Sequence, residues 1–194
     1  MAKLEILTYP NPRLREVSTP VEVFDAKIAK LVDDMLETMY HAQGIGLAAP
    51  QVGETKQILV IDTRARFKKD SDDLEIEDQT DLESKVKQPL ILINPKIVKG
   101  VGKTSLNEGC LSVPSYFEKV ERFEKIEVSA ENVKGKTFTF VTDGLLAVCV
   151  QHEMDHLEGK LFIDRISFLK SQKIKNQITK QGYPKKKADK NLTS

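Results

Sequence analysis

The sequence predicts a single α+β domain. Short strand-like segments are grouped in the middle of the 194 residues, and helical segments lie before and after them. Because strands and helices do not alternate along the chain, this order favours an α+β fold over a regular βαβ architecture. A chain of this length also suits one domain with one sizeable core. We therefore expect one domain over residues 1–182 and a basic, flexible tail over residues 183–194.

The first helix is expected from about Ala26 to Tyr40. Its apolar residues follow the i, i+3, i+4, i+7 spacing of a buried helical stripe, and they are Ile28, Leu31, Val32, Met35, Leu36 and Met39. Asp25 can cap the amino-terminal end of this helix. Gly44 can take the left-handed conformation that ends a helix, and it opens the segment GIGLAAPQ.

Four short segments have the composition of β-strands. They are rich in β-branched and aromatic residues, and they read QILVID (57–62), PLILINP (89–95), KIEVSAE (125–131) and TFTFV (137–141). Gly135 lies between the last two segments and supplies the turn expected of a β-hairpin. These strands account for the β part of the predicted fold.

Charge is balanced over the whole chain but not along it. The 30 basic and 29 acidic side chains nearly cancel, so no overall field favours nucleic acid or an anionic membrane. Residues 70–83 are mostly acidic with few apolar side chains, so we expect a mobile, solvated excursion over about 65–88. No signal peptide or membrane span is recognisable. Two cysteines do not make a disulfide framework, which favours a cytoplasmic protein.

Two more helices are expected after the last strand. The first begins near Asp143 and Gly144, ends by Gly159, and contains the segment CVQHEMDHLEG (149–159). The second is amphipathic, runs roughly over residues 167–181, and ends at Gly182.

The first of these helices carries a candidate metal site. His152 and His156 are four residues apart, so they lie on one helix face and can bind the same ion. Glu153 is rotated by about 100° from His152, too far to be the natural third ligand but well placed to reach a water on that metal. The alternative is that these are ordinary helix-surface residues. Two of the chain's three histidines fall at this spacing, which favours the site.

The third ligand decides the kind of metal site. One metalloprotease pattern, H-E-x-x-H-x-x-G-x-x-H, would need a histidine where this chain has Phe162. Other proteases of this kind are expected to take a glutamate further along, and no glutamate follows Glu158. Both protease interpretations therefore lose their third ligand.

Three upstream residues remain as candidates for the third ligand. Cys149 is seven residues from His156, a rise of about 10.5 Å that a short side chain can hardly span, and its apolar neighbours favour a buried thiol. His41 lies at the end of the first helix, where a solvated side chain is expected. Cys110 lies in EGCLS (108–112), an irregular segment able to present a thiolate, and we favour it. Three ligands leave the fourth position open, as in catalytic sites, whereas a closed structural site would also need Cys149 or His41.

Three segments in this order resemble the signature segments of peptide deformylases: GIGLAAPQ (44–51), EGCLS (108–112) and QHEMDHLEG (151–159). The resemblance covers roughly residues 4–64 and 89–181. It implies antiparallel sheets packed around the central histidine-bearing helix, with helices near both ends of the chain. It also implies a cytoplasmic bacterial enzyme that removes the formyl group from N-formylmethionine at the start of new polypeptides. The implied metal is iron(II), for which zinc, nickel or cobalt can substitute.

The resemblance assigns roles by position. The implied metal ligands are Cys110, His152 and His156. The implied substrate-binding edge and methionine pocket include Ile45, Gly46, Leu145 and Val148. Gln51 and the backbone N–H of Leu111 would donate hydrogen bonds to the formyl oxygen. A metal-bound water would attack the formyl carbon, while Glu153 takes its proton and passes it to the leaving amine.

This chain departs from the family in three places. Phe117 stands where many bacterial members carry an arginine near the substrate backbone, so contacts beyond the methionine are in question. The acidic excursion is longer than usual, and Lys185, Lys186 and Lys187 extend past the last helix. In some members that helix is thought to dock on the ribosome, where these lysines would add phosphate contacts. The rival interpretations are a zinc endopeptidase and a non-enzymatic metal module or ribosome-binding adaptor.

Overall fold

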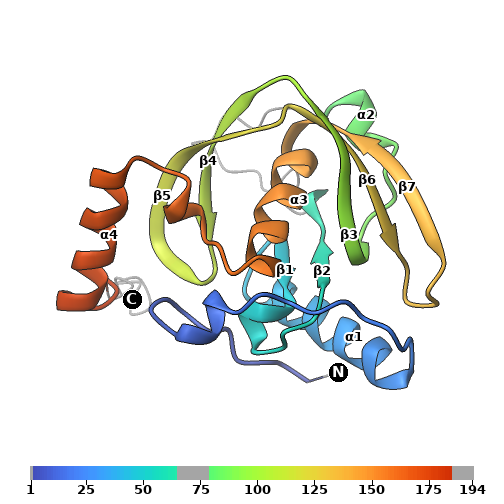
Figure 1. Ribbon diagram of the computed structural model, residues 1–194, viewed down its shortest axis with the longest axis horizontal. Helices are drawn as coiled ribbons and strands as arrows, with labels where there is room; N and C mark the ends of the chain where they lie inside the picture. Colours follow the sequence, from blue (N-terminus) through green and yellow to red (C-terminus); the bar gives the residue numbers. More distant parts are fainter. Residues whose placement is uncertain (1, 65–78, 185–194) are drawn as a thin grey trace, which may run out of the picture.

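Helix α3 (Gly144–Leu157) runs through the middle of the fold, with β-strands on both sides (Figure 1). The computed structural model describes residues 2–64 and 79–184 of the chain. A five-stranded antiparallel sheet has the order β1-β2-β3-β6-β7, and its strands are Gly46–Ala48, Ile58–Ile61, Leu90–Val101, Lys125–Glu131 and Thr137–Thr142. Strands β4 (Thr104–Cys110) and β5 (Val113–Arg122) form a separate antiparallel pair. The predicted α+β class is confirmed.

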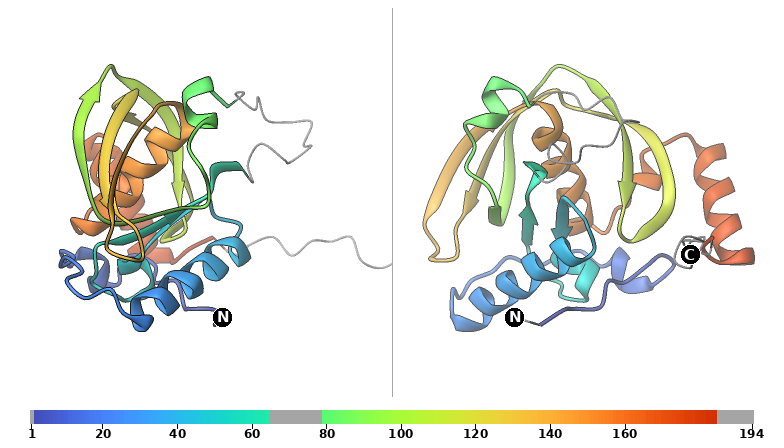
Figure 2. Two further views of the ribbon diagram at one scale, coloured as in Figure 1. Left: turned by 90° about the vertical axis from the view of Figure 1, so that its right-hand side faces the viewer. Right: turned by 180° about the vertical axis from the view of Figure 1, so that it is seen from behind.

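Strand β2 is buried on both faces because helices cover both faces. Leu59 and Ile61 belong to the core cluster that includes the apolar side of α3. Ile58 and Val60 belong instead to the cluster that includes helix α1 (Ala26–His41). Alternate residues of a strand point to opposite faces, so α1 and α3 pack on opposite sides of β1 and β2 (Figure 2). A sheet segment covered in this way holds the metal-site helix firmly.

Helix α1 matches its prediction except at its end. Asp25 is the N-cap, and its Oδ1 accepts hydrogen bonds from two first-turn N–H groups at 2.9 and 3.0 Å. The left-handed residue after the helix is Gln43, with φ of +57°, and not Gly44 as expected. Gly44 is needed for space instead, because a Cβ there would lie 2.8 Å from Cδ1 of Leu111.

The four predicted strands are confirmed, but β1, β4 and β5 were not predicted. Residues on β4 and β5 alternate between buried or half-buried and exposed, and several of the exposed ones are charged, so no apolar run marks them. Cys110 is consequently the last residue of a strand and does not lie in an irregular segment. The pairing register shifts between Gly109 and Cys110, which pairs with Val113 across a tight turn. The chain therefore reverses direction immediately after Cys110, through Leu111 and Ser112.

The expected solvated excursion is wrong for residues 79–88. Helix α2 (Asp81–Ser84) lies there, and its Glu83 is 1% exposed. The Glu83 carboxylate accepts hydrogen bonds from the Leu146 N–H at 2.9 Å and from the Thr63 hydroxyl at 3.0 Å. An acidic side chain is buried here because it caps the amino-terminal end of α3, where backbone N–H groups lack helical partners. Residues 65–78 lie outside the described residues.

Glu83→Ala is expected to destabilise the protein by about 1–3 kcal/mol, because it leaves buried donors without an acceptor. Glu83→Gln keeps an acceptor oxygen and should lose less. Denaturant unfolding of both variants checks this, with the exposed Lys85→Ala as control. Equal stability of wild type and Glu83→Ala would contradict the capping role.

A comparison of the wild type with Glu83→Gln also tests how the stability provided by Glu83 depends on pH. Burial raises the pKa of Glu83 above its ordinary 4.5, although the hydrogen bonds from Thr63 and Leu146 oppose the shift. A raised pKa means that this carboxyl contributes most stability below pH 4.5 and loses it as the pH rises through the folded-state pKa. The stability of wild type relative to Glu83→Gln should therefore fall as the pH rises above 4.5. If the difference in unfolding free energy between the wild type and Glu83→Gln does not change with pH, the raised pKa of Glu83 is contradicted.

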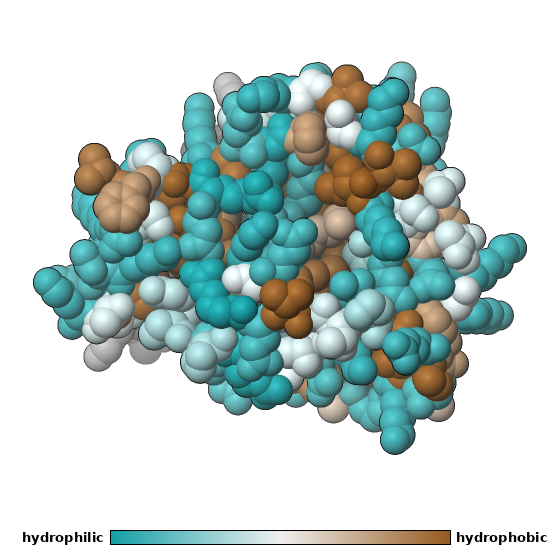
Figure 3. All heavy atoms as spheres, in the orientation of Figure 1, coloured by the Kyte–Doolittle hydropathy of each residue, from teal (hydrophilic) through white to brown (hydrophobic). Residues whose placement is uncertain are grey.

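Helix α4 (Phe168–Gln181) packs against the β4–β5 side of the molecule (Figure 1). Ile174 and Ile178 share a core cluster with Val113 and Val120. The first residues of α4, Phe168 and Leu169, are exposed, and Figure 3 shows hydrophobic side chains at this end of the molecule as well as in several other places on the same face. No helix among residues 2–64 and 79–184 is long and apolar enough to cross a membrane. Residues 185–194 of the expected tail lie outside the described residues.

Candidate metal centre and active site

Cys110, His152 and His156 meet at one point between the end of β4 and the middle of α3. The possible ligand atoms of the three residues all lie within 4.8 Å of one another. The Cys110 Sγ is 3.3 Å from the His156 Nε2. Both histidines are buried, while Cys110 is half-buried. The predicted convergence of the three side chains is therefore confirmed.

The donor set fits a divalent metal. A tetrahedral ion with Zn–S of about 2.3 Å and Zn–N of about 2.0–2.1 Å would separate sulfur and nitrogen by roughly 3.5 Å, close to the observed distance. Burial, together with the charge on His152, lowers the pKa of His156, so its ring is neutral and Nε2 can bind a metal. Burial opposes protonation of His152, yet Cys110 and Glu108 raise its pKa. A cation at this point would take the place of that proton.

A buried charge network orients His152. The His152 Nδ1 lies 2.8 Å from Glu108 Oε2, which leaves Nε2 for a metal. Arg122 donates two hydrogen bonds to Glu108 at 2.8 and 2.9 Å and a third to Asp155 at 2.5 Å. Arg165 also pairs with Asp155. Burial alone would raise the pKa of Glu108, but Arg122 and His152 hold it below its ordinary value, so the carboxylate stays charged.

Sequence reasoning missed this network. From the sequence, Glu108 stands out only as part of the EGCLS segment, and Arg122 has no predicted role in the metal site. The two residues come together through β4–β5 pairing, which places Glu108 and Arg122 on the same hairpin. An ion pair between two strands can be predicted from the sequence only after both strands have been predicted. A carboxylate that orients a metal-binding histidine is a common requirement of metal sites.

Glu153 is buried beside Gly46, the first residue of β1. A Cβ on Gly46 would lie 2.3 Å from Glu153 Oε1 and 2.9 Å from the Cys149 Sγ, so any other residue there would have to displace the Glu153 carboxylate. The other carboxylate oxygen, Oε2, has no hydrogen-bond partner among the described residues. Burial raises the pKa of Glu153 to about 7, a value suited to taking and giving a proton near neutrality. Cys149 is a buried thiol, as predicted.

Gln51 lies beside Cys110. It belongs to the 3-10 helix η2 (Ala49–Val52) and is 1% exposed. Its Oε1 accepts a hydrogen bond from the Ala48 N–H at 2.8 Å, so its amide nitrogen must point the other way. That nitrogen donates to the Ser112 hydroxyl at 3.1 Å and lies 3.6 Å from the Cys110 Sγ. Leu111 follows Cys110 directly, and its side chain packs on Gly44.

The four residues expected to contact substrate lie on β1 and α3. Val148 is one helical turn before His152 and is buried, whereas Leu145 is half-buried in the first turn. Ile45 precedes β1, and its carbonyl accepts a hydrogen bond from the Asp62 N–H at 2.8 Å. Gly46 begins β1, which pairs only with β2 within the described residues. One edge of β1 therefore has no strand partner within the described residues, although all three residues of β1 are buried and the Ala48 N–H donates to Gln51.

Phe117 lies on β5 and is 62% exposed. Its ring covers the backbone of Gly109, because a Cβ there would lie 2.4 Å from Phe117 Cε1. Phe117 therefore lies on the exposed face of the β4–β5 hairpin, opposite Gly109, the residue before Cys110.

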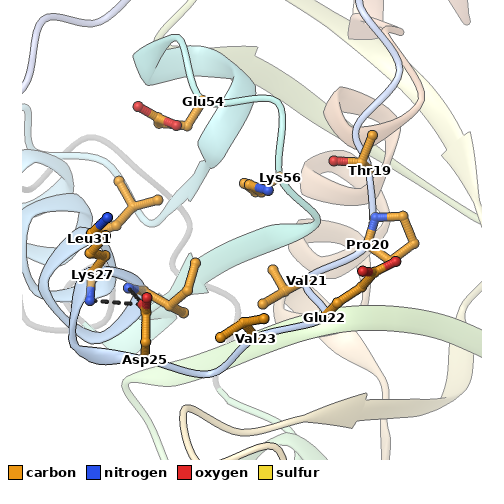
Figure 4. A pocket seen from close by; sticks show the side chains of 11 residues that line it. Thr19, Pro20, Val21, Glu22, Val23, Asp25, Lys27, Leu31, Glu54 and Lys56 are labelled. Carbon is orange, nitrogen blue, oxygen red and sulfur yellow. Dashed lines mark hydrogen bonds between the residues drawn. The ribbon is translucent and has the colours of Figure 1, made fainter.

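A separate groove of about 790 Å³ lies near the amino-terminal end of α1 (Figure 4). It is lined by residues 19–31 and 54–56 and contains none of the predicted site residues. Its charged side chains have both signs, since Lys27 and Lys56 are basic and Glu22, Asp25 and Glu54 are acidic. This groove is not part of the metal centre.

Two histidines and a buried carboxylate on an H-E-x-x-H helix, together with a cysteine from β4, form a group that could hold a metal ion, an arrangement typical of metal-dependent hydrolases. The family model described as polypeptide deformylase matches residues 3–172. The chain is 47% identical over 180 residues to the peptide deformylase of Alkalilimnicola ehrlichii, covering 93% of this chain and 91% of that protein. The chain belongs to the peptide deformylase family, and it is an enzyme.

Two solved structures have the same fold. The peptide deformylase of Legionella pneumophila is 40% identical, with a TM-score of 0.77 over 92% of this chain and 95% of that one. The peptide deformylase of Ehrlichia chaffeensis in complex with actinonin is 40% identical, with a TM-score of 0.79 over 93% of this chain and 98% of that one.

Proposed function

We propose that this enzyme removes the formyl group from the N-terminal formylmethionine of newly made polypeptides and releases formate. The observation that carries the proposal is the meeting of Cys110, His152 and His156 next to the buried carboxylate of Glu153. The names of the relatives point to the same reaction. Residues 1–182 would form the single catalytic domain, working in the cytoplasm of a bacterium on nascent chains.

The proposed metal is iron(II), with zinc, nickel or cobalt as substitutes, held by Cys110, His152 and His156. When bound, a divalent ion would lower the pKa of a water to about 7 and polarise a carbonyl group. Cys110 would bind as the thiolate, whose charge partly neutralises the ion. A half-buried thiolate is open to oxidation, so we expect activity to be lost in air.

Glu153 is proposed to move the proton. Hydrolysis of a formamide needs a water to attack the formyl carbon and a proton to reach the departing amine nitrogen. Glu153 would accept the proton of that water and deliver it to the amine, which a pKa of about 7 allows in both directions. Its Oε2 has no hydrogen-bond partner among the described residues, which leaves it available for this exchange.

Gln51 and Leu111 are proposed to stabilise the charge that develops on the formyl oxygen. The Gln51 amide is already oriented by the Ala48 N–H, so its nitrogen needs no reorganisation to donate. The backbone N–H of Leu111 would be the second donor. Losing one such donor typically costs about 10²–10³ in rate.

The substrate is proposed to lie along the edge of β1 that has no strand partner among the described residues. Ile45 and Gly46 would offer backbone groups to the peptide, and Leu145 and Val148 would form walls of the methionine pocket. Both are apolar and lie within two turns of His152 on α3. Phe117 would offer an apolar surface to residues after the methionine.

Gly46→Ala is expected to lower kcat/KM for a formylated peptide by about 10²-fold, because its methyl group would displace the Glu153 carboxylate. The displacement does not touch the ligands, so metal content should stay close to that of the wild type. Formate release and metal analysis on the same preparation check this prediction. Full activity in Gly46→Ala would mean that Glu153 need not keep its observed position.

The reaction is tested with matched peptides. Formate release is measured from formyl-Met-Ala-Ser, with acetyl-Met-Ala-Ser and a longer peptide blocked at both ends as controls. The proposal predicts turnover of the formylated peptide alone. Internal cleavage of the blocked peptide would instead support the endopeptidase alternative.

Ribosome docking is a second, weaker part of the proposal. Lys185, Lys186 and Lys187 lie outside the described residues, and they follow α4. Replacing the three lysines with alanine should reduce co-sedimentation with ribosomes at low salt. Unchanged co-sedimentation would remove these lysines from the proposed contact.

A further inference from the structure

The last described residues of the chain lie beside the turn that follows Cys110. Tyr183, two residues after α4, is half-buried. Its hydroxyl donates to the Tyr9 carbonyl at 2.8 Å and lies 3.3 Å from the Ser112 carbonyl, so one hydrogen is shared between the two. Its ring packs edge-on against Tyr116, with centroids 6.4 Å apart. Figure 1 shows the end of α4 next to the β4–β5 turn.

Ser112 connects this contact to the metal ligand. Its N–H donates to the Cys110 Sγ at 3.4 Å, and its hydroxyl accepts from the Gln51 amide at 3.1 Å. Its carbonyl accepts from the Tyr9 N–H at 2.9 Å as well as facing the Tyr183 hydroxyl. Ser112 is fully buried. One residue therefore aims the sulfur of Cys110 and the amide of Gln51, and its own position is fixed from behind by Tyr183.

We propose that Tyr183 is a positioning residue for the metal centre, acting through Ser112 on Cys110. Its hydroxyl restrains the Ser112 carbonyl, and that restraint keeps the Ser112 N–H directed at the sulfur. Residues that orient a metal ligand typically change metal affinity by about 10–100-fold when removed. The inference rests on the proposed Cys-His-His metal site but does not depend on which substrate is hydrolysed.

If Tyr183 only stabilised the fold, Tyr183→Phe would lower stability and leave the Cys110 site of the folded protein unchanged. When the Tyr183 hydroxyl is removed, the Ser112 carbonyl keeps the Tyr9 N–H, and the acceptor that loses its donor is the carbonyl of Tyr9, a half-buried residue. Tyr183→Phe also keeps the ring contact with Tyr116. The fold should therefore survive this change while the Cys110 turn becomes less restrained.

Tyr116→Phe is a matched control in the same cluster. The Tyr116 hydroxyl is buried and has no hydrogen-bond partner among the described residues, so its removal leaves the Cys110 turn unchanged. Both variants are made in the full-length chain and loaded with cobalt(II). The dissociation constant is measured by chelator competition, and the thiolate-to-cobalt absorption band reports the Cys110 bond. Thermal unfolding confirms that each variant is folded.

We expect Tyr183→Phe to weaken cobalt binding about tenfold and to reduce or shift the thiolate band, with Tyr116→Phe like the wild type. Equal cobalt affinity and spectra in Tyr183→Phe and wild type would overturn the inference alone. An equal loss in both variants would also overturn it, because ring packing would then be the cause. A wild-type chain that binds cobalt but releases no formate would refute the proposed function and leave this inference standing. A wild-type chain that binds no cobalt would refute both.

Discussion

Glu153→Ala is expected to lose at least about 10²–10⁴ in kcat for a formylated peptide while keeping its metal. The loss follows because Glu153 is a buried carboxylate directly after His152 on α3, and its Oε2 has no hydrogen-bond partner among the described residues. It is not a ligand itself, so the Cys110, His152 and His156 group is intact in the variant. Formate release and metal stoichiometry, measured on the same protein, check both halves of the prediction.

Glu158→Ala is the matched control for this variant. Glu158 caps the end of the same helix but is exposed, so its loss should leave kcat near that of the wild type. Turnover that survives in Glu153→Ala would refute the proposed proton transfer. Loss of the metal would show that Glu153 is part of the metal-binding group.

Arg122→Met is expected to destabilise the protein by about 3–5 kcal/mol. Arg122 lies between two buried carboxylates, those of Glu108 and Asp155, and its removal leaves both less compensated. Methionine fills part of the space but supplies no hydrogen bond. Because Glu108 also holds His152, a weaker metal site should accompany the loss of stability. Denaturant unfolding of the metal-free protein measures the first effect without the second.

Lys103→Met gives the comparison on the surface. The Lys103–Glu121 pair has a similar contact distance, 2.8 Å, but both side chains are exposed. Water and salt screen such a pair, so little stability should be lost. If Arg122→Met unfolds at the same denaturant concentration as Lys103→Met, the buried network does not stabilise the fold as argued.

Local sequence signals predicted the parts of the site that lie on helices. Two histidines at i and i+4 on a predicted helix placed His152 and His156 correctly, and the missing downstream ligand pointed to Cys110. The three family segments then placed Gln51 and Gly46, which the structure brings next to Cys110 and Glu153. Such signals succeed because each depends on a few neighbouring residues.

Long-range contacts explain what the sequence did not reveal. Arg122 is 14 residues from Glu108 and 33 from Asp155, and only strand pairing and helix packing bring the three together. Glu83 looked like part of an acidic, solvated segment, but it is 63 residues from the N–H that it caps. Tyr183 reaches Ser112 across 71 residues. Composition cannot predict such burial, since the partners come from the fold.

Formate release from formyl-Met-Ala-Ser by oxygen-free protein, measured alongside its metal content, tests the central claim most directly. The account predicts rapid release from iron(II)-loaded protein that decays on exposure to air, and no release from Cys110→Ala. No release from iron-, nickel- or zinc-loaded protein would contradict the proposed catalytic centre, and a structural metal module would then be the better explanation.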